Sequence, residues 1–142
     1  MRLIGFNFTK ISIEDIRSPS QSLEEVKINT EMDIISIEEV KKSPLNTKDA
    51  ILSIDFTYNV NYNPSFAKIA INGKILVALD PKLSKDVLQE WKDKKMPSDF
   101  RLFLLNIVLR KSTLKALQLE DELNLPLHVP MPSFRKEENS KE

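Results

Sequence analysis

His128 is the only histidine of the chain, so it would have to be the base of any nucleophilic catalysis of the serine–histidine type. Ser133 as nucleophile and Asp121 or Glu122 as acid complete the one conceivable set. Their spacing does not resemble a nucleophile turn, because the histidine lies in an extended run that is rich in proline. We interpret His128 as a histidine that is hydrogen-bonded or faces solvent, and we predict that the protein is not an enzyme.

Metal and cofactor chemistry lacks its usual residues in this sequence. The chain has no cysteine, two glycines and one histidine, which excludes a Cys-ligated zinc, a two-histidine metal clasp and a glycine-rich phosphate loop. Glu120, Asp121 and Glu122 carry metal-ligating groups, but neighbours along a helix point apart, so we interpret the run as a solvated helix face. We therefore expect no metal and no cofactor.

Charge and hydropathy limit the partners of the protein. The 142 residues include 21 Lys or Arg and 21 Asp or Glu, so the net charge is zero and the attraction that nucleic-acid binding relies on is missing. Phe56, Tyr58 and Tyr62 alternate with polar residues, which indicates core positions and not a base-stacking surface. The most apolar window, residues 100–109, is far shorter than the roughly 20 residues of a membrane span. We expect a cytoplasmic protein without nucleic-acid binding or membrane insertion.

Alternation of apolar and polar residues predicts four strands in the first two-thirds of the chain. Residues 51–62 and 67–79 alternate regularly on either side of a turn, and this short connection predicts an antiparallel hairpin. Gly73 within it indicates a bulge or a close backbone approach. Residues 3–13 and 26–37 each shift phase once, as a bulge would cause. The loop between these two strands is too long for a tight hairpin, so we expect them to pair through a longer crossover.

Helical periodicity begins after residue 79. Asp80 and Pro81 predict a helix start, and apolar residues at helical spacing continue to about residue 95. Eight of the ten residues 100–109 are apolar, which is more than the single stripe that a surface helix buries. We infer that this helix packs against a second subunit; the alternative is complete cover by the first helix and the C-terminal segment of the same chain. A further helical piece is expected at residues 113–123.

The C-terminal part combines apolar residues with helix and strand breakers. Residues 123–132 contain three prolines, which exclude a central strand, so we expect this segment to lie extended against an apolar surface. It completes a single domain of residues 1–134, which a charged, disordered tail at 135–142 follows.

The order of elements resembles the SecB family of export chaperones and its shorter prokaryotic SecB-like relatives. Residues 8–14, Phe-Thr-Lys-Ile-Ser-Ile-Glu, are similar to the opening strand of the family, and residues 26–33 are similar to its second strand. Residues 100–111 take the place of its long helix. Residues 123–130, Leu-Asn-Leu-Pro-Leu-His-Val-Pro, resemble its Leu-Asn-Leu-Ala-Pro stretch. The resemblance covers residues 3–134 in pattern.

This resemblance implies an α+β fold in which a four-stranded antiparallel sheet carries two or three helices on one face. It also implies dimers that pair into a homotetramer, with the long helix as the interface; the residues concerned are Phe100, Phe103, Leu104, Ile107 and Val108. Clients would lie in apolar grooves between the crossover, the second strand and the last helical segment. The residues implied for these grooves are Ile16, Leu23, Ile28, Met32, Leu114, Leu117, Leu123, Leu125, Leu127 and Val129.

Apolar surface in the late segments and the family pattern together predict an ATP-independent chaperone. Such a holdase binds extended apolar segments of unfolded proteins or preproteins. The alternative is an adaptor or subunit without catalysis that binds one dedicated folded partner, such as an antitoxin or an assembly factor. Members of the family hand clients to the secretion motor SecA or serve antitoxins, and the sequence favours neither partner.

Overall fold

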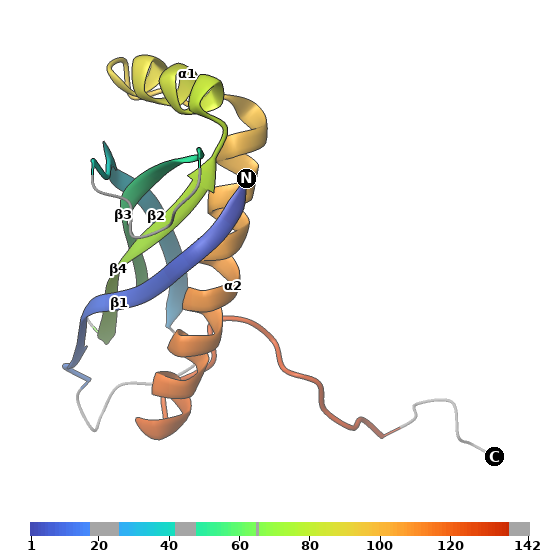
Figure 1. The fold of residues 1–142 in the computed structure, drawn as a ribbon. Helices are drawn as coiled ribbons and strands as arrows, with labels where there is room; N and C mark the ends of the chain where they lie inside the picture. Colours follow the sequence, from blue (N-terminus) through green and yellow to red (C-terminus); the bar gives the residue numbers. More distant parts are fainter. Residues whose placement is uncertain (18–25, 42–47, 65, 137–142) are drawn as a thin grey trace.

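The computed structural model describes residues 1–17, 26–41, 48–64 and 66–136. Its strands and helices are β1 (Arg2–Asp15), β2 (Lys27–Glu39), β3 (Ala50–Asn63), β4 (Ala67–Leu79), α1 (Pro81–Trp91) and α2 (Ser98–Glu122). The four strands form one antiparallel sheet. Helix α2 runs along one face of this sheet and α1 lies across its end (Figure 1). The predicted α+β architecture is confirmed.

Strand order places the two most regular strands at the centre of the sheet. The order is β1-β4-β3-β2, so the predicted hairpin of β3 and β4 forms the middle and is confirmed. β1 pairs with β4, with Phe6 opposite Ile75, and β2 pairs with β3, with Met32 opposite Tyr58. The expected pairing of β1 with β2 is therefore wrong. β3 and β4 carry the longest unbroken apolar alternation and gain most from burial at the centre, whereas the interrupted strands occupy the edges.

Both predicted phase shifts are confirmed as irregularities of the sheet. The register shifts between Phe8 and Lys10 in β1 and between Ile34 and Ser36 in β2. Gly73 lies at a close approach: a Cβ atom there would stand 2.3 Å from Cζ of Phe56, whose ring crosses the glycine. The missing side chain thus makes room for an aromatic ring from the neighbouring strand.

The helices begin as predicted but divide differently. Oδ1 of Asp80 accepts a hydrogen bond from the Lys82 N–H at 3.3 Å, and Pro81 occupies the first helical position. The expected separate helix at 113–123 is wrong, because α2 is continuous over 25 residues, or about 37 Å. Residues 98–122 contain no proline or glycine that would break it.

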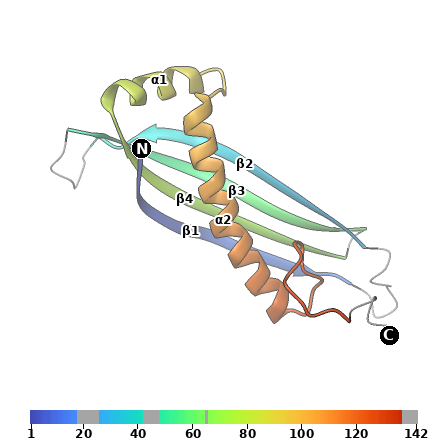
Figure 2. The same ribbon diagram turned by 90° about the vertical axis from the view of Figure 1, so that its right-hand side faces the viewer.

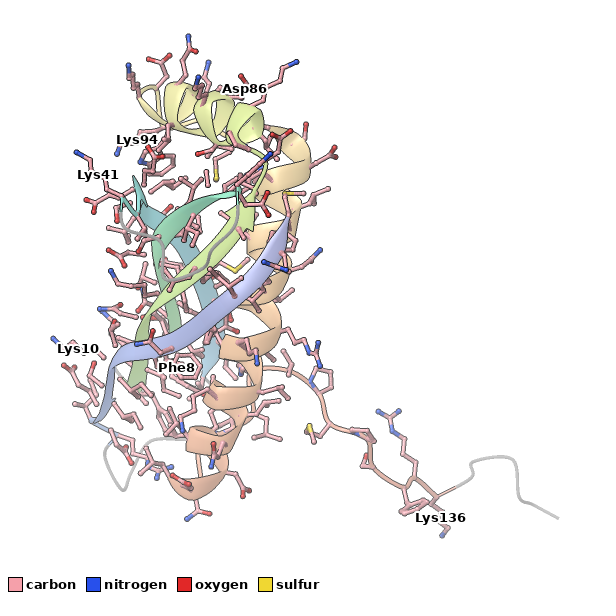
Figure 3. The ribbon with its side chains drawn as sticks, viewed as in Figure 1. Phe8, Lys10, Lys41, Asp86, Lys94 and Lys136 are labelled. Atoms are coloured by element: carbon pink, nitrogen blue, oxygen red, sulfur yellow. The ribbon has the colours of Figure 1, made fainter. Side chains whose placement is uncertain are left out.

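The core lies between α2 and the sheet, and α2 crosses the strands obliquely (Figure 2). Its fully buried residues on the helix include Phe100, Leu104, Val108 and Ala116. The other face of the sheet carries polar groups such as the Lys74–Asp55 ion pair, at 3.2 Å. Lys10 of β1 points into solvent (Figure 3). Because one face is polar, the binding surfaces described below all lie on the helix side or at the sheet edges.

Candidate functional site

A groove of about 500 Å³ opens between the edge strand β2 and the two helices. We call it the β2–helix groove. Its lining residues are Met32, Asp33, Ile34, Ile35, Trp91, Lys94, Met96, Arg101 and Leu105. Most of these side chains are apolar, and the three charged residues lie among them, so the groove combines apolar surface with a polar rim as peptide-binding sites do.

A tight turn after α1 positions the helical wall of this groove. Lys94 has a positive φ of 58°, its N–H donates to the Trp91 carbonyl at 2.9 Å, and the Lys95 N–H donates to the Glu90 carbonyl at 3.1 Å. This pattern closes a helix in the Schellman manner and reverses the chain. The ammonium group of Lys94 lies 4.5 Å from the centre of the Trp91 ring, and Figure 3 places this lysine at the end of α1. Trp91 and Met96 therefore face β2 from a fixed turn.

The strand wall of the groove is an open sheet edge. β2 is the last strand of the sheet, and no other strand of the described residues pairs with its outer side. Such an edge offers unpaired N–H and C=O groups to an extended peptide, while pockets along the strand accept alternate side chains. Met32 and Ile34 are packed against the core and Ile35 is exposed, so apolar and main-chain contacts are available together.

A second hollow lies at the other end of α2, where the chain turns back. Asn124 has a positive φ of 55°, and the Leu125 N–H donates to the Glu120 carbonyl at 2.9 Å. The Arg17 guanidinium donates to the carbonyls of Leu123, at 2.8 Å, and Asn124, at 3.0 Å. The helix end is thereby capped, and residues 125–131, which we call the strap, form neither helix nor strand, bend at residues 128–129 and contact Tyr58 and Tyr62 of the sheet.

A buried polar cluster fixes the strap to the sheet. Nδ1 of His128 lies 2.9 and 2.7 Å from the two carboxylate oxygens of Glu120, and the His128 backbone N–H donates to Oε1 at 2.9 Å. Because a carboxylate accepts, Nδ1 donates to it, and Nε2 accepts from the Tyr58 hydroxyl at 2.8 Å. The Tyr62 hydroxyl donates to the Pro126 carbonyl. Four polar groups of the strap thus have hydrogen-bond partners: the backbone N–H, Nδ1 and Nε2 of His128 and the carbonyl of Pro126.

The two phenols of the cluster stay protonated far into the alkaline range. Burial raises the pKa of Tyr58 above its ordinary value, and the nearby Glu120 charge adds to this. Burial also raises the pKa of Tyr62, strongly, with the same carboxylate as the second cause. Both hydroxyls are therefore donors at neutral pH, which suits them to hold a carbonyl and an imidazole.

The one catalytic set that the sequence could offer, which we did not expect to function, is not assembled in this structure. His128 pairs with Glu120, whereas Asp121, Glu122 and Ser133 are exposed. Both ring nitrogens of His128 have partners, in agreement with the interpretation as a hydrogen-bonded histidine. The interpretation of Glu120 as part of a solvated face is wrong, because this residue is completely buried beneath the strap. Neighbours on a helix do point apart, and Glu120 points inward.

Two further absences concern the part of the chain that the structure describes. No group of three or more His, Cys, Asp or Glu side chains there is arranged to hold a metal ion. Among the two described helices, neither is long and apolar enough to cross a membrane.

The residues implied for client binding divide between several places. Met32 alone lines the β2–helix groove, and Ile28 lies farther along the same strand, opposite Tyr62. Leu125 and Leu127 line a hollow of about 440 Å³ beside the strap, and Leu125 is buried. Among the rest, Ile16 and Leu114 are exposed, Leu117, Leu123 and Val129 are half-buried, and Leu23 lies outside the described residues.

The residues expected at an oligomer interface lie largely in the core of the single chain. Phe100, Leu104 and Val108 are 0% exposed against the sheet, which leaves them no surface for a second subunit. Phe103 and Ile107 are half-buried and pack against the same core. The large apolar residues that α2 leaves exposed are others, Leu102, Leu109 and Leu114.

Several residues of the β2–helix groove and of the cluster beneath the strap were not identified as functional from the sequence. Trp91, Met96 and Leu105 of the groove were not among the residues that the sequence indicated for client binding. Glu120 was assigned to solvent, and Tyr58 and Tyr62 to the core, although their hydroxyl groups bind the strap. No local signal in the sequence indicates the roles of the two tyrosines, because they alternate with polar residues as other core residues of the strand do.

Comparison with known proteins shows a similarity to a solved structure. No protein-family model matches the chain, and no curated protein sequence is similar enough to count as a relative. Among solved structures, the Rv1957 SecB-like chaperone of Mycobacterium tuberculosis, in complex with a ChAD peptide from the HigA1 antitoxin, superposes with a TM-score of 0.53. The two chains share 11% identity, and the match covers 96% of this chain and 92% of the other. The fold is SecB-like.

Proposed function

We propose that this protein is an ATP-independent holdase that binds extended apolar segments of unfolded proteins. The observation that carries the proposal is the β2–helix groove, which sets apolar side chains from two helices beside an unpaired strand edge. Affinity would come from burial of client side chains, at about 25 cal/mol per Å² of apolar area, less the entropy of ordering the client. The similarity to a SecB-like chaperone that was solved with a bound peptide supports this reading.

Suppression of aggregation tests the proposal directly. A reduced, unfolded test protein should stay in solution with the wild-type chain at several-fold molar excess, without ATP. Met32→Ser and Leu105→Ser, which remove apolar surface from the two walls of the groove, should each weaken binding about tenfold, the equivalent of about 1.4 kcal/mol. Emission of Trp91, the only tryptophan, should change when a client enters the groove.

Leu3→Ser provides the matched control, because Leu3 is an exposed apolar residue on the opposite edge strand. It should leave client binding unchanged. No protection by the wild-type chain, or an equal loss in the Leu3 and Met32 variants, would contradict a holdase that uses this groove.

The second candidate is an adaptor for one dedicated partner. It is favoured by the similar chaperone, whose bound peptide comes from a single antitoxin. A pull-down that yields one stoichiometric protein, with no affinity for unfolded chains, would support the adaptor against the holdase. Binding of several unrelated unfolded proteins would decide for the holdase.

We infer further that the chain forms a dimer or tetramer. Support comes from Leu102, which is 61% exposed, and Leu109, which is 46% exposed, because apolar side chains left open on a long helix favour a protein partner. Native mass spectrometry should show an oligomer that Leu102→Glu and Leu109→Glu together dissociate. A strict monomer would contradict this inference without affecting the groove.

A further inference from the structure

The strap covers one end of a row of β2 side chains that continues into the β2–helix groove. On the helix side of β2, Ile28 stands opposite Tyr62, Met32 opposite Tyr58 and Ile34 opposite Phe56, and the polar Thr30 lies between the first two. Ile28 and Ile34 are six residues apart, or about 20 Å along a strand. Met32 and Ile34 also line the groove. The strap binds Tyr62 and Tyr58, the residues opposite Ile28 and Met32.

The strap is held in the way that a site holds a peptide ligand. Leu125 is 5% exposed and fills an apolar pocket, and the Pro126 carbonyl accepts from the Tyr62 hydroxyl. Three residues after the leucine, His128 inserts its imidazole between Glu120 and Tyr58. The side chains of Leu127 and Met131 remain exposed. One apolar anchor, one carbonyl contact and one polar side chain thus define the bound segment.

The strap can leave without breaking a helix or a strand. Residues 125–136 carry neither helix nor strand, so the strap is not part of the sheet ladder. The groups that it satisfies, the hydroxyls of Tyr58 and Tyr62 and the Glu120 carboxylate, are polar, and water can bind them once the strap is gone. Release of the strap would expose apolar surface of Leu125, Tyr58 and Tyr62, which are 5%, 1% and 1% exposed.

We propose that the strap is an intramolecular substitute for a client. The surface beneath it is a second binding site, and its ligand is an extended segment with a leucine followed three positions later by a histidine. Release of the strap joins this site to the β2–helix groove in one continuous track along β2. This inference rests on the proposed holdase function and adds to it a segment of the protein that competes with clients.

Two variants release the strap through independent contacts, and a third serves as control. Leu125→Ala shortens the apolar anchor, and His128→Ala removes the imidazole from the polar pocket. Leu127→Ala changes an exposed side chain of the same segment. Amide hydrogen exchange at residues 125–131 should be faster in the two release variants and unchanged in the control. The affinity for a reduced and carboxymethylated test protein should rise about tenfold in both, because a site that is mostly occupied binds with an affinity reduced by its open fraction.

A peptide added in trans tests the specificity of the site. A synthetic peptide with the sequence of residues 123–132 should displace the unfolded test protein from the His128→Ala chain. The same peptide with alanine in place of its histidine should displace it much less. Should both release variants fold poorly, Tyr62→Phe removes the Pro126 contact with little change in volume and should show the same faster exchange and tighter binding, to a smaller degree.

The outcomes separate this inference from the proposed function. Faster exchange of the strap with unchanged or weaker client binding overturns the strap as a substitute for a client and leaves the holdase intact. Unchanged hydrogen exchange of the strap in Leu125→Ala, His128→Ala and Tyr62→Phe also overturns it. If neither the wild-type chain nor any variant binds an unfolded protein, the proposed function fails and the strap inference fails with it.

Discussion

The two ends of α2 lie beside surfaces of different chemistry, although a similar backbone turn closes α1 just before this helix and α2 itself at its end. At the start of the helix, the β2–helix groove is open, is lined by apolar and charged side chains, and contains Trp91. At its end, the surface below the strap is filled by the chain itself through Glu120, Tyr58 and Tyr62. An open apolar groove binds many segments with little selection, whereas a polar pocket selects for one side chain. One scaffold can therefore combine contacts that accept many segments with contacts that select one side chain, along a single strand.

The aromatic residues make this comparison measurable. The only tryptophan lies in the groove, and the only two tyrosines lie below the strap. Tryptophan emission therefore reports the first region and tyrosine absorbance the second. The two signals together show whether a substitution or a change of pH affects both regions or only one.

The largest effect is expected from the core that both regions share. Leu104 is completely buried beneath α2, so Leu104→Ala should lower the free energy of unfolding by about 3 kcal/mol. Urea denaturation should show one transition in which the Trp91 and tyrosine signals change together. Leu102→Ala, on the exposed side of the helix, should stay within about 0.5 kcal/mol of the wild type. Two separate transitions would show that the ends of α2 unfold independently.

A smaller and local effect is expected from Glu120→Gln. The amide loses the charge in the hydrogen bonds to the His128 N–H and Nδ1, which should cost about 2 kcal/mol. Native Trp91 emission should not change, because the groove lies at the other end of the helix. Glu122→Gln, on an exposed side chain two residues farther, should have an effect below about 0.5 kcal/mol. Equal effects of the two variants would contradict the role of Glu120 in holding the strap.

The parts of the fold that depend on local patterns could be predicted from the sequence. Alternation at residues 51–62 and 67–79 predicts the central hairpin, and the two phase shifts predict the irregularities of β1 and β2. Strand order could not be predicted in the same way. It depends on which strands gain most from burial across the whole sheet, and the pattern of residues 3–13 alone does not contain that comparison.

The candidate sites were harder to predict from the sequence, because they depend on how the helix crosses the sheet. The buried positions of α2 move from Phe100, Leu104 and Val108 to Ala116 and Glu120, so the buried side turns around the helix as it crosses obliquely (Figure 2). The apolar residues that surround the helix at 100–109 are therefore largely buried against other parts of the same chain. Glu120 is buried only because the strap folds back over it, and no local pattern indicates that return.

Alkaline pH should affect the strap region through its two phenols. The pKa of Tyr58 and that of Tyr62 are raised above 10.0 in the folded protein, so the folded state favours the protonated phenols. Below pH 10 both states are protonated and this contribution to stability is complete. As the pH rises above 10, the unfolded chain releases its protons first, and the free energy of unfolding falls. Ultraviolet absorbance of the phenolates should lag behind that of free tyrosine and then rise steeply with unfolding. A smooth titration close to that of free tyrosine, with Trp91 emission unchanged, would contradict the buried cluster.

The smallest effects are expected at the two turns that close the helices. Lys94 and Asn124 both have a positive φ, near 58° and 55°, but asparagine tolerates this conformation better than lysine does. Lys94→Gly should relieve strain of up to about 1 kcal/mol and lose a contact with the Trp91 ring of about 0.5 kcal/mol. The net gain, about 0.5 kcal/mol, should appear as a higher urea midpoint, whereas Asn124→Gly should change it by only a few tenths of a kcal/mol. If Lys94→Gly destabilises the protein instead, the lysine–tryptophan contact outweighs the backbone strain, and the groove wall is then held by that side chain more than by the turn.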